Sequence, residues 1–522
     1  MIKFKRIFLI FLFVFPHLIT AQIFNNGVVK TLEIEIVGRP TWQKSISLGK
    51  EGLLLFLKKD ITKAVIYKFD TDLKKLWESE IFLDAEHQPT SYSINNQTIT
   101  FVFSENQGMY YQVFNIDLST GKFENNGFEL KEYFQDQDFV FLNQRILMAG
   151  LNEKGASFYD FDFKEDNGDF ISANIEGKTQ IQYLKYNAQN GLVETLWSVK
   201  VAGFSNEKKK KGEFIKDAFV VFAQYDTSGK LLLKTTIPSS SGNFPLTATL
   251  THFNSSTNII TGTYQSNSGS KGIYFSKIED NKTTITKFYD YKLLLTGNPV
   301  IEEEILKKLL KTFTFNQSNV VIDKNILTVG GSFYQSKYEL LSSSNPYYNS
   351  YNPNDSNVGN IQNYNYPSAK SKQIFKGYNY LNGFVANFDL EGNLLSQTKV
   401  EMNQISPQLD ETIAISETKS VAVCVKGNVF IGNYLGFSNK KIAKLSDETA
   451  DPKNNQFIAS YQGVRNWYEN YFIADGSRIK FEAIKDMEAL KTKSSKRKKG
   501  QQPLPQTNIK KIIYLSKIQG FE

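Results

Sequence analysis

Alternating apolar and polar residues recur in short runs along the chain and predict β-strands. Clear runs lie at 53–57, 98–103, 219–225 and 259–264, and segments rich in Gly, Asn and Asp separate them. Alternation with a period of two residues is typical of a strand with one buried face, and helical periodicity is scarce. The sequence therefore predicts an all-β protein built from hairpins and meanders.

A weak sequence repeat occurs at the turns between some of these strands. In each copy a strand ends in an aromatic or apolar residue followed by Asp or Asn, the chain turns, usually through Gly, and an apolar strand returns. The Asp or Asn of the five copies is Asp70, Asp117, Asn187, Asp226 and Asp389, and a degenerate copy lies near Asp280. The Asp or Asn side chain can cap such a turn, and Gly adopts its positive-φ position.

The spacing of the copies indicates the architecture. Asp70 and Asp117 are 47 residues apart. Asn187 and Asp226 are 39 residues apart. These intervals bracket the period of about 40 to 50 residues expected for four-stranded propeller blades. We attribute the longer interval after Asp117 to an extra stretch at 158–178.

The repeat resembles the outer hairpin of β-propellers of the quinoprotein-like and WD-like repeat type. Quinoprotein-like blades carry an Asp, a Thr-Gly turn and a Trp. Parts of that pattern are matched by Asp117, Thr120, Gly121, Trp77 and Trp197. The resemblance implies a β-propeller of six to eight four-stranded blades, with seven favoured, and it supports this fold rather than a quinone cofactor.

The two ends of the chain predict how the ring closes. Residues 511–518 repeat the character of 271–278, but no return strand follows the terminal copy, and the predicted strand at 31–37 has no partner nearby in sequence. Because an open edge invites aggregation, we expect the two terminal strands to pair within one blade. The side chains expected to pack inward are Leu32, Ile34 and Ile36, and those expected to face outward are Glu33 and Glu35.

The N-terminus predicts export. Lys3, Lys5 and Arg6 precede an apolar run at 7–15, an order typical of a secretory signal. The run has nine residues, whereas a membrane-spanning helix needs about 20. We therefore expect cleavage after Ala21, no transmembrane span in the mature chain, and a periplasmic or secreted protein.

We expect residues 1–21 to be the signal peptide and 22–522 to be a single propeller domain with three insertions. The insertions lie at about 299–315, 336–380 and 484–509. The first has the apolar spacing and charge order of a short amphipathic helix. The second is rich in Tyr, Asn and Ser, and the third is basic and rich in Pro and Gln.

The net charge and the cysteine content disfavour two kinds of function, nucleic-acid binding and cysteine-based catalysis. The formal net charge of +8 falls to +5 without the signal peptide, and the basic tracts at 208–211 and 491–499 carry ten positive charges, so the rest of the mature chain is mildly acidic. Nucleic-acid binding, which needs positive charge spread over a folded face, is therefore disfavoured. The single cysteine, Cys424, lies in an alternating Val-rich run, which predicts a packed strand residue rather than a nucleophile.

Candidate catalytic chemistry is sparse. Only His87 and His252 remain after removal of the signal, and we expect both to be structural or surface residues. The chain lacks the nucleophile-elbow, phosphate-loop, zinc-helix and dinucleotide motifs. The acidic stretch at 160–169 could supply oxygen ligands to Ca²⁺, but a hydrated turn is the favoured interpretation. We therefore predict no catalytic residue and no cofactor, and leave metal ligands unassigned.

The insertion at 336–380 is the candidate recognition surface. Tyr offers a large, rigid contact area with a polar tip, and Asn adds adaptable hydrogen bonding. A long segment without fixed structure is the equally weighted alternative. The candidate binding residues are Tyr347, Tyr348, Tyr351, Tyr364 and Tyr366.

Fold and composition together favour a non-catalytic function. We expect an exported propeller that acts as a protein-binding scaffold, in the form of a periplasmic accessory subunit of an outer-membrane transport or secretion assembly. The alternative is a secreted carbohydrate-active enzyme, a glycoside hydrolase or lyase, that uses paired carboxylates in the propeller channel. A protein partner at the cell envelope is the leading expectation, and a glycan is the second.

Overall fold

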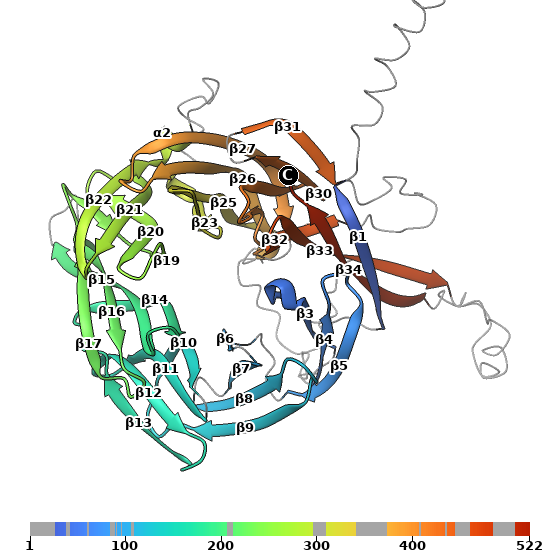
Figure 1. Cartoon of the computed structure of the whole chain (residues 1–522), viewed down its shortest axis with the longest axis horizontal. Helices are drawn as coiled ribbons and strands as arrows, with labels where there is room; N and C mark the ends of the chain where they lie inside the picture. Colours follow the sequence, from blue (N-terminus) through green and yellow to red (C-terminus); the bar gives the residue numbers. More distant parts are fainter. Residues whose placement is uncertain are drawn as a thin grey trace, which may run out of the picture.

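The computed structural model is a β-propeller. Among the described residues, eight sheets surround a common axis as its blades (Figure 1). This count lies within the predicted range of six to eight and is one above the number favoured there. The described residues are 27–37, 42–59, 62–83, 89, 91–95, 97–105, 109–142, 144–205, 212–295, 310–340, 373–406, 409–433, 436–443, 460–483 and 507–521.

Blades 1 to 4 each contain four antiparallel strands that follow one another along the chain from the ring axis outward. Blade 1 comprises β2 (Trp42–Ser47), β3 (Leu53–Lys58), β4 (Lys63–Phe69) and β5 (Lys75–Phe82). Blade 2 comprises β6 (Ser91–Ile94), β7 (Thr98–Glu105), β8 (Tyr110–Asp117) and β9 (Phe123–Glu129). Blade 3 comprises β10 (Gln135–Leu142), β11 (Arg145–Asn152), β12 (Gly155–Asp162) and β13 (Asn167–Ser172). Blade 4 comprises β14 (Lys178–Asn187), β15 (Leu192–Ser205), β16 (Gly212–Tyr225) and β17 (Leu231–Ile237).

Blades 5 and 6 have two short strands in the innermost position, and blade 8 joins the two ends of the chain. Blade 5 comprises β18 (Asn243–Pro245), β19 (Thr249–His252), β20 (Thr257–Ser266), β21 (Lys271–Glu279) and β22 (Lys282–Asp290). Blade 6 comprises β23 (Thr314–Gln317), β24 (Val321–Asp323), β25 (Ile326–Leu340), β26 (Gln373–Asp389) and β27 (Leu394–Ser406). Blade 7 comprises β28 (Ile413–Ile415), β29 (Ser420–Val425), β30 (Asn428–Asn433) and β31 (Gly436–Ala443). Blade 8 comprises β32 (Ser460–Tyr468), β33 (Tyr471–Ala483), β34 (Thr507–Gln519) and β1 (Val28–Val37).

Aspartate caps the outer hairpins of four blades, as the repeat predicted. The capping residues are Asp70, Asp117, Asp226 and Asp389, whose side chains accept backbone N–H bonds of 2.7 to 3.0 Å. In the turn after Asp117, Gly121 has a φ of +72°, the left-handed conformation that Gly adopts most readily. The degenerate copy at Asp280 is the two-residue turn between β21 and β22.

The third copy of the repeat is different. Asn187 is the last residue of β14, at the turn to β15 in blade 4, and Asp226 caps the outer turn of the same blade. The interval of 39 residues between them was therefore wrong as a blade period. The stretch at 158–178 is not an insertion either, because β12 and β13 of blade 3 occupy most of it. This additional blade explains why the ring has eight.

Outer turns dock on the preceding blade. Trp77 of β5 donates from Nε1 to the carbonyl of Leu118 over 3.0 Å. A Cβ on Gly121 would lie 2.6 Å from the Trp77 ring, so this close approach requires Gly. Trp77 therefore links blade 1 to blade 2, whereas Trp197 is fully buried in the core between blades 3 and 4.

The predicted ring closure is confirmed. β1 pairs antiparallel with β34, which aligns Leu32 with Leu515 and Ile34 with Ile513 (Figure 1). Ile36 is buried in the core between blades 8 and 1, and Leu32 and Ile34 pack against the same core. The two glutamates of β1 are exposed, as expected from the alternation.

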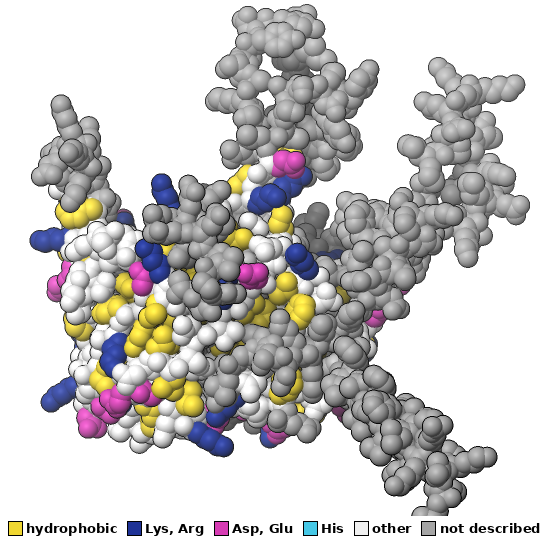
Figure 2. All heavy atoms as spheres, turned by 90° about the horizontal axis from the view of Figure 1, so that it is seen from above, with side chains coloured by type: hydrophobic (Ala, Val, Ile, Leu, Met, Phe, Trp, Pro, Cys, Tyr) yellow, Lys and Arg dark blue, Asp and Glu magenta, His cyan; other side chains and the backbone are white. Residues whose placement is uncertain are grey.

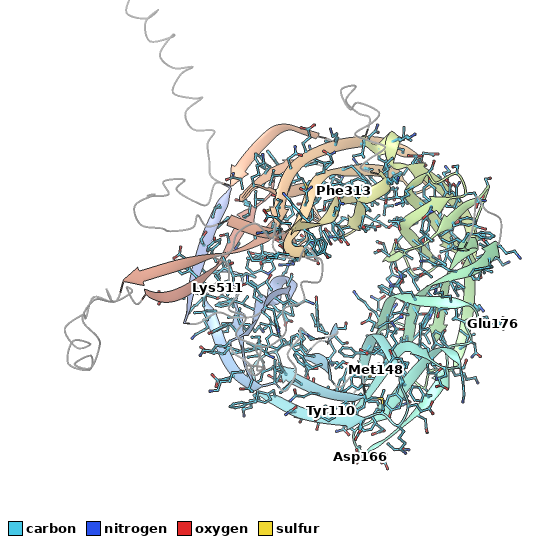
Figure 3. The ribbon with its side chains drawn as sticks, turned by 180° about the vertical axis from the view of Figure 1, so that it is seen from behind. Tyr110, Met148, Asp166, Glu176, Phe313 and Lys511 are labelled. Carbon is cyan, nitrogen blue, oxygen red and sulfur yellow. The ribbon has the colours of Figure 1, made fainter. Side chains whose placement is uncertain are left out.

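The described helices are short. The 3₁₀ turn η1 (Gly49–Glu51) joins β2 to β3, and α2 (Tyr291–Leu295) follows β22. α2 packs into the core between blades 5 and 6, where Phe313 also lies (Figure 3). Residues 310–312 are helical, in agreement with the end of the helix predicted in the 299–315 insertion.

Several sequence predictions fall outside the described residues. They are the signal peptide at 1–21, residues 299–309 of the predicted helix, the basic tract at 208–211, His87, and most of the basic insertion at 484–509. These remain predictions.

Candidate functional site

A polar cavity of about 880 Å³ lies where the inner strands of several blades meet. Its volume is within the range of about 300 to 1,000 Å³ that ligand pockets usually have. We call it the axial pocket. Its lining residues are Gln43, Lys44, Ser45, Ile46, Ser47, Tyr92, Asn316, Asn319, Phe375, Tyr378, Leu409, Asp410, Glu411, Arg465, Asn466 and Asp475.

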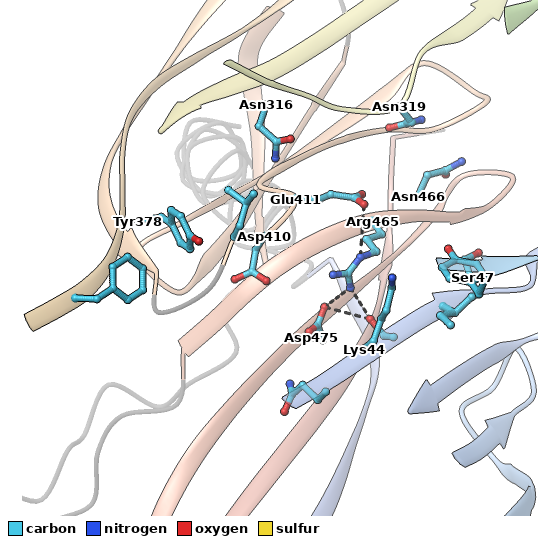
Figure 4. A pocket seen from close by; sticks show the side chains of 16 residues that line it. Lys44, Ser47, Asn316, Asn319, Tyr378, Asp410, Glu411, Arg465, Asn466 and Asp475 are labelled. Carbon is cyan, nitrogen blue, oxygen red and sulfur yellow. Dashed lines mark hydrogen bonds and ion pairs between the residues drawn. The ribbon is translucent and has the colours of Figure 1, made fainter. Parts of the chain in front are cut away.

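Arg465 on β32 is the centre of an ion-pair network (Figure 4). Its Nη1 lies 2.6 Å from Asp475 Oδ1 on β33 and also donates to the Ser45 hydroxyl, and its Nε lies 3.8 Å from Glu411 Oε1. Although burial disfavours the charged guanidinium, the carboxylates of Asp475 and Glu411 raise the pKa of Arg465. The positive charge of Arg465 is therefore permanent and already matched within the protein.

Lys44 on β2 lies beside Arg465 (Figure 4). Its Nζ is 4.8 Å from the centre of the Tyr92 ring on β6. Burial and the positive charge of Arg465 lower the pKa of Lys44. Among the described residues this ammonium group makes no hydrogen bond or ion pair. Oxygen atoms of a ligand in the pocket could therefore accept hydrogen bonds from it.

Two amide side chains that line the pocket have unused polar atoms. Gln43 is only 7% exposed, and within the described part of the chain neither its Oε1 nor its Nε2 has a hydrogen-bond partner. The same holds for Oδ1 of Asn466. Folded proteins pair most buried polar groups, because each unpaired group costs about 1 to 3 kcal/mol. A ligand that both donates and accepts hydrogen bonds would satisfy these atoms.

The acidic side of the pocket is held rigidly by blade 6. Ser406 donates to Asp410 Oδ2 over 2.8 Å. The Tyr380 hydroxyl accepts from the Asp410 backbone N–H over 2.9 Å and donates to its carbonyl over 3.1 Å. Asp410 is 4% exposed, whereas the neighbouring Glu411 is exposed. The pocket thus has a fixed carboxylate and a more accessible one.

The predicted recognition insertion reaches this pocket through its described part. β25 and β26 extend into the insertion as paired strands that align Leu340 with Gln373. Phe375 and Tyr378 of β26 line the pocket. The five candidate residues named from the sequence, which lie outside the described residues, are Tyr347, Tyr348, Tyr351, Tyr364 and Tyr366.

His252 belongs to a different polar site, at the contact between blades 4 and 5. Its Nε2 lies 3.0 Å from Oε2 of the buried Glu194, and its Nδ1 lies 2.7 Å from Asn258 Oδ1. The hydrogen bond to Glu194 raises the pKa of His252, although burial opposes the shift. His252 therefore binds within the protein and does not line the axial pocket.

Cys424 is a packed strand residue, as predicted. It is fully buried with Ala422 in the core between blades 7 and 8, while Val421 and Val423 face a different core. Burial raises the pKa of its thiol, so the reactive thiolate is disfavoured.

The acidic stretch at 160–169 forms ordinary turn and strand contacts. Asp160 forms an ion pair with Arg145, and Asp162 accepts the backbone N–H of Lys164 over 2.9 Å. Asp166 lies at the outer edge of the ring (Figure 3). Within the described ranges, no group of three or more His, Cys, Asp or Glu side chains could hold a metal ion.

Sequence reasoning missed the residues that form the axial pocket. Arg465 and Ser45 are 420 positions apart, and only the closed ring brings them together. A weak signal was present in the inner strand of blade 1, where a Gln-Lys pair follows Trp42, in contrast to the apolar residues of the next strand at 53–57. Alternation alone could not show that this pair faces a cavity.

Comparison with known proteins shows likeness of fold only. No protein-family model and no curated protein matches the chain. Among solved structures it is similar to the polysaccharide lyase Uly1, with a TM-score of 0.38, 8% identity, and coverage of 83% of this chain and 90% of that one. It is also similar to a puromycin-hydrolyzing peptidase of Mycobacterium tuberculosis, with a TM-score of 0.35, 8% identity, and coverage of 74% and 49%.

A third likeness is to Synechocystis apocarotenoid oxygenase, with a TM-score of 0.30, 6% identity, and coverage of 48% of this chain. The chain spans 64% of the length of that oxygenase. Because all three TM-scores are below 0.5, a function has to rest on the residues of the axial pocket.

The surface adds two observations. No helix in the described part of the chain is long and apolar enough to cross a membrane. The face shown in Figure 2 carries basic, acidic and hydrophobic side chains in an interspersed pattern. The described side chains on that face therefore form no broad region of a single charge.

Proposed function

We propose that this protein is an exported, non-catalytic β-propeller that recognises its partner through the axial pocket. The observation that carries the proposal is the buried amide of Gln43, which lacks a partner among the described residues and lies next to Lys44 in a polar cavity of about 880 Å³. Polar groups that are desolvated but unpaired are stabilised when a ligand supplies the missing hydrogen bonds. Such groups favour binding at this place over a purely structural role.

Binding is favoured over catalysis by the state of the pocket's carboxylates. Asp475 is paired with Arg465 over 2.6 Å, and Asp410 accepts from Ser406 over 2.8 Å. A glycosidase needs one carboxyl group that can give up a proton and a second that stays ionised, both facing the substrate. Engaging two of the pocket's carboxylates inside the protein supports a recognition site.

The location and the type of repeat belong to the same proposal. We infer export from the basic N-terminus and the apolar run at 7–15, with a mature chain that begins near Gln22 and acts at the cell envelope. N-terminal sequencing of the protein recovered outside the cytoplasm tests this point, and a cytoplasmic form that retains Met1 would contradict it. The docking of Trp77 on Gly121 supports a repeat of the quinoprotein-like kind, used for the fold alone.

The proposal is tested with the immobilised mature protein and a native cell-envelope extract. We expect the combined variant Gln43→Met, Lys44→Met to retain at least about tenfold less of the bound material, because two side chains that can donate hydrogen bonds to a ligand are lost. Lys282→Met is the matched control, since this exposed lysine lies on β22. Equal retention by the pocket variant and the control would exclude the axial pocket as the recognition site.

The second candidate is a carbohydrate-active enzyme, and the presence of three carboxylates in one cavity favours it. Depolymerisation of polysaccharides, measured as new reducing ends, would reveal such activity. Under this alternative, Glu411→Gln abolishes turnover while the retained material stays bound. Retention without any turnover in the unmodified protein would leave the binding function alone.

A further inference from the structure

We propose that the axial pocket and an adjoining row of aromatic side chains on the β25–β26 hairpin bind a neutral oligosaccharide chain. This inference rests on the proposed function and names the class of ligand. The aromatic row consists of Tyr338, Phe375 and Tyr378, and the last two also line the pocket.

The aromatic row is continuous. The ring centres of Tyr338 and Phe375 are 5.6 Å apart, and those of Phe375 and Tyr378 are 5.2 Å apart. The rings of each pair are inclined by 61° and 73°, respectively, so they meet edge to face. Edge-to-face contacts stabilise aromatic pairs and hold each ring in a defined orientation. The row therefore leads from the pocket toward the outer part of the hairpin as a fixed surface.

The row is also open to solvent. Tyr338 is 56% exposed and Phe375 is 42% exposed, although both are large aromatic residues that face each other on paired strands. Exposed apolar groups that are contiguous with a polar pocket are typical of ligand sites. The C–H-bearing face of a sugar ring is apolar, and it can cover an aromatic face while the hydroxyl groups at its edge remain hydrogen-bonded.

The polar lining matches the edge of a sugar. Each sugar hydroxyl is both a donor and an acceptor, and neighbouring hydroxyls lie close together. The pocket offers the Lys44 ammonium group as a donor, the Gln43 amide as a donor and an acceptor, and the exposed Glu411 carboxylate as an acceptor. Donors and acceptors are therefore mixed over one cavity, as a polyhydroxylated ligand requires.

The charges of the pocket favour a neutral sugar over an acidic one. Its lining contains two cationic residues, Lys44 and Arg465, and three carboxylates. The guanidinium of Arg465 already faces Asp475 at 2.6 Å and Glu411 at 3.8 Å. An incoming anion would meet a lining with net negative charge and only one cation that lacks an ion pair within the described chain. An uncharged ligand avoids this repulsion.

The experiment measures binding of the mature protein to purified short oligosaccharides by titration calorimetry. The neutral probes are gluco-, manno- and xylo-oligosaccharides, the acidic probes are oligogalacturonides, and unmodified peptides of similar length form a third group. We expect neutral oligosaccharides to bind, and Phe375→Ala and Tyr378→Ala each to weaken binding by about tenfold. Tyr378→Phe should keep most of the affinity, because it preserves the ring.

Tyr186→Ala is the matched control, since Tyr186 is 42% exposed on β14 and does not line the pocket. It should bind oligosaccharides like the unmodified protein. Binding only to acidic oligosaccharides, or only to peptides, would overturn the inference, and so would neutral binding that ignores the two alanine substitutions. If envelope retention still depends on Gln43 and Lys44 in those cases, the proposed function stands without the glycan.

Discussion

Two buried carboxylates, one in blade 4 and one in blade 8, show how the ring treats a charge in its interior. Glu194 is 2% exposed and Asp475 is 3% exposed. Oε1 of Glu194 accepts side-chain amide bonds of 3.1 to 3.2 Å from Asn187, Asn190 and Gln224. Asp475 instead forms an ion pair with Arg465, and both residues line the axial pocket.

The difference separates a structural network from one prepared for a ligand. Oε1 of Glu194 accepts from three amides of blade 4, and Oε2 lies 3.0 Å from Nε2 of His252 in blade 5, so groups of the chain itself surround this carboxylate. Beside Asp475 a cavity remains, and Gln43 in its lining has no partner among the described residues. A buried charge that is paired with groups of the chain stabilises the fold, whereas a cavity lined by unused donors and acceptors gains from a ligand.

The two networks also differ in how the chain assembles them. The amide donors to Glu194 lie within 30 residues of it, in blade 4 itself. Ser45 and Arg465 are separated by 420 positions, and they meet only because β1 completes blade 8 beside blade 1. The axial pocket therefore depends on ring closure, and the Glu194 site does not.

The largest expected effect comes from removing β1. Deleting residues 22–37 exposes the edge of β34 and removes Ile36 from its core, so we expect aggregation or a loss of about 3 to 6 kcal/mol in unfolding free energy. Hydrogen exchange should accelerate in β32–β34 before it does so in blade 4. Deleting only residues 22–26 is the control, and equal destabilisation by both deletions would show that the closure does not stabilise the ring.

Glu194→Ala should have the next largest effect. It leaves three amide donors and His252 without their acceptor, and breaking such a buried site costs about 3 to 5 kcal/mol. Denaturant unfolding monitored by fluorescence measures the loss. Glu51→Ala, at an exposed position in η1, is the control, and a similar small change in both variants would contradict the structural role of Glu194.

Asp475→Asn should cost less, about 1 to 3 kcal/mol, because Glu411 still faces the Arg465 guanidinium. Unlike the change at Glu194, it should also disturb the axial pocket and reduce the retention of envelope material. If the variant loses stability but still retains the same amount of envelope material, the Asp475 network has only a structural role, as the Glu194 network does.

The His252–Glu194 pair predicts a pH dependence. The pKa of His252 is raised above 6.5, so its contribution is complete below pH 6.5 and is lost as the pH rises through the folded-state pKa. The pKa of Glu194 is lowered below 4.5, despite the opposing effect of burial, because His252 and the amides favour the carboxylate. Its contribution is present above pH 4.5 and is lost as the pH falls through the folded-state pKa.

The pair is therefore strongest between pH 4.5 and 6.5. Because the side chain of His252 is 41% exposed, solvent screening should limit the effect to below about 1 kcal/mol. The measurement is the unfolding free energy of the unmodified protein and of His252→Asn across the range from about pH 5 to 8. The decline of the unfolding free energy toward high pH should be smaller in the variant. Identical curves would show that His252 does not contribute to the contact between blades 4 and 5.

Gln43→Met should have the smallest effect on stability and a clear one on binding. Replacing an unpaired buried amide by an apolar side chain of similar size should change the unfolding free energy by less than about 1 kcal/mol, with a gain more expected than a loss. Retention of envelope material should fall. A marked loss of stability would mean that the amide is hydrogen-bonded within the protein, like the amide donors to Glu194.

Local chemistry explains the parts of the fold that could be predicted. Strand alternation, the Asp caps and the complementary termini involve neighbouring residues or a simple pairing rule, and the turn at Asp117 and the β1–β34 register follow from them. The blade count was less certain, because Asn187 has the same pattern as an outer turn. Its amide caps the inner turn and also donates to Glu194, a contact that no local pattern contains.

By itself, the sequence determined the strands, their turns and the pairing of the two ends, because alternation, capping and an unpaired edge act over short range or through backbone hydrogen bonds. Only the tertiary structure decided that there are eight blades and that Lys44, Gln43 and Arg465 share one cavity. Strand alternation places a side chain on a face of its sheet but does not say which other blade that face will meet. The closed ring decides which blades are neighbours, because blades that are far apart in the chain pack against each other in it.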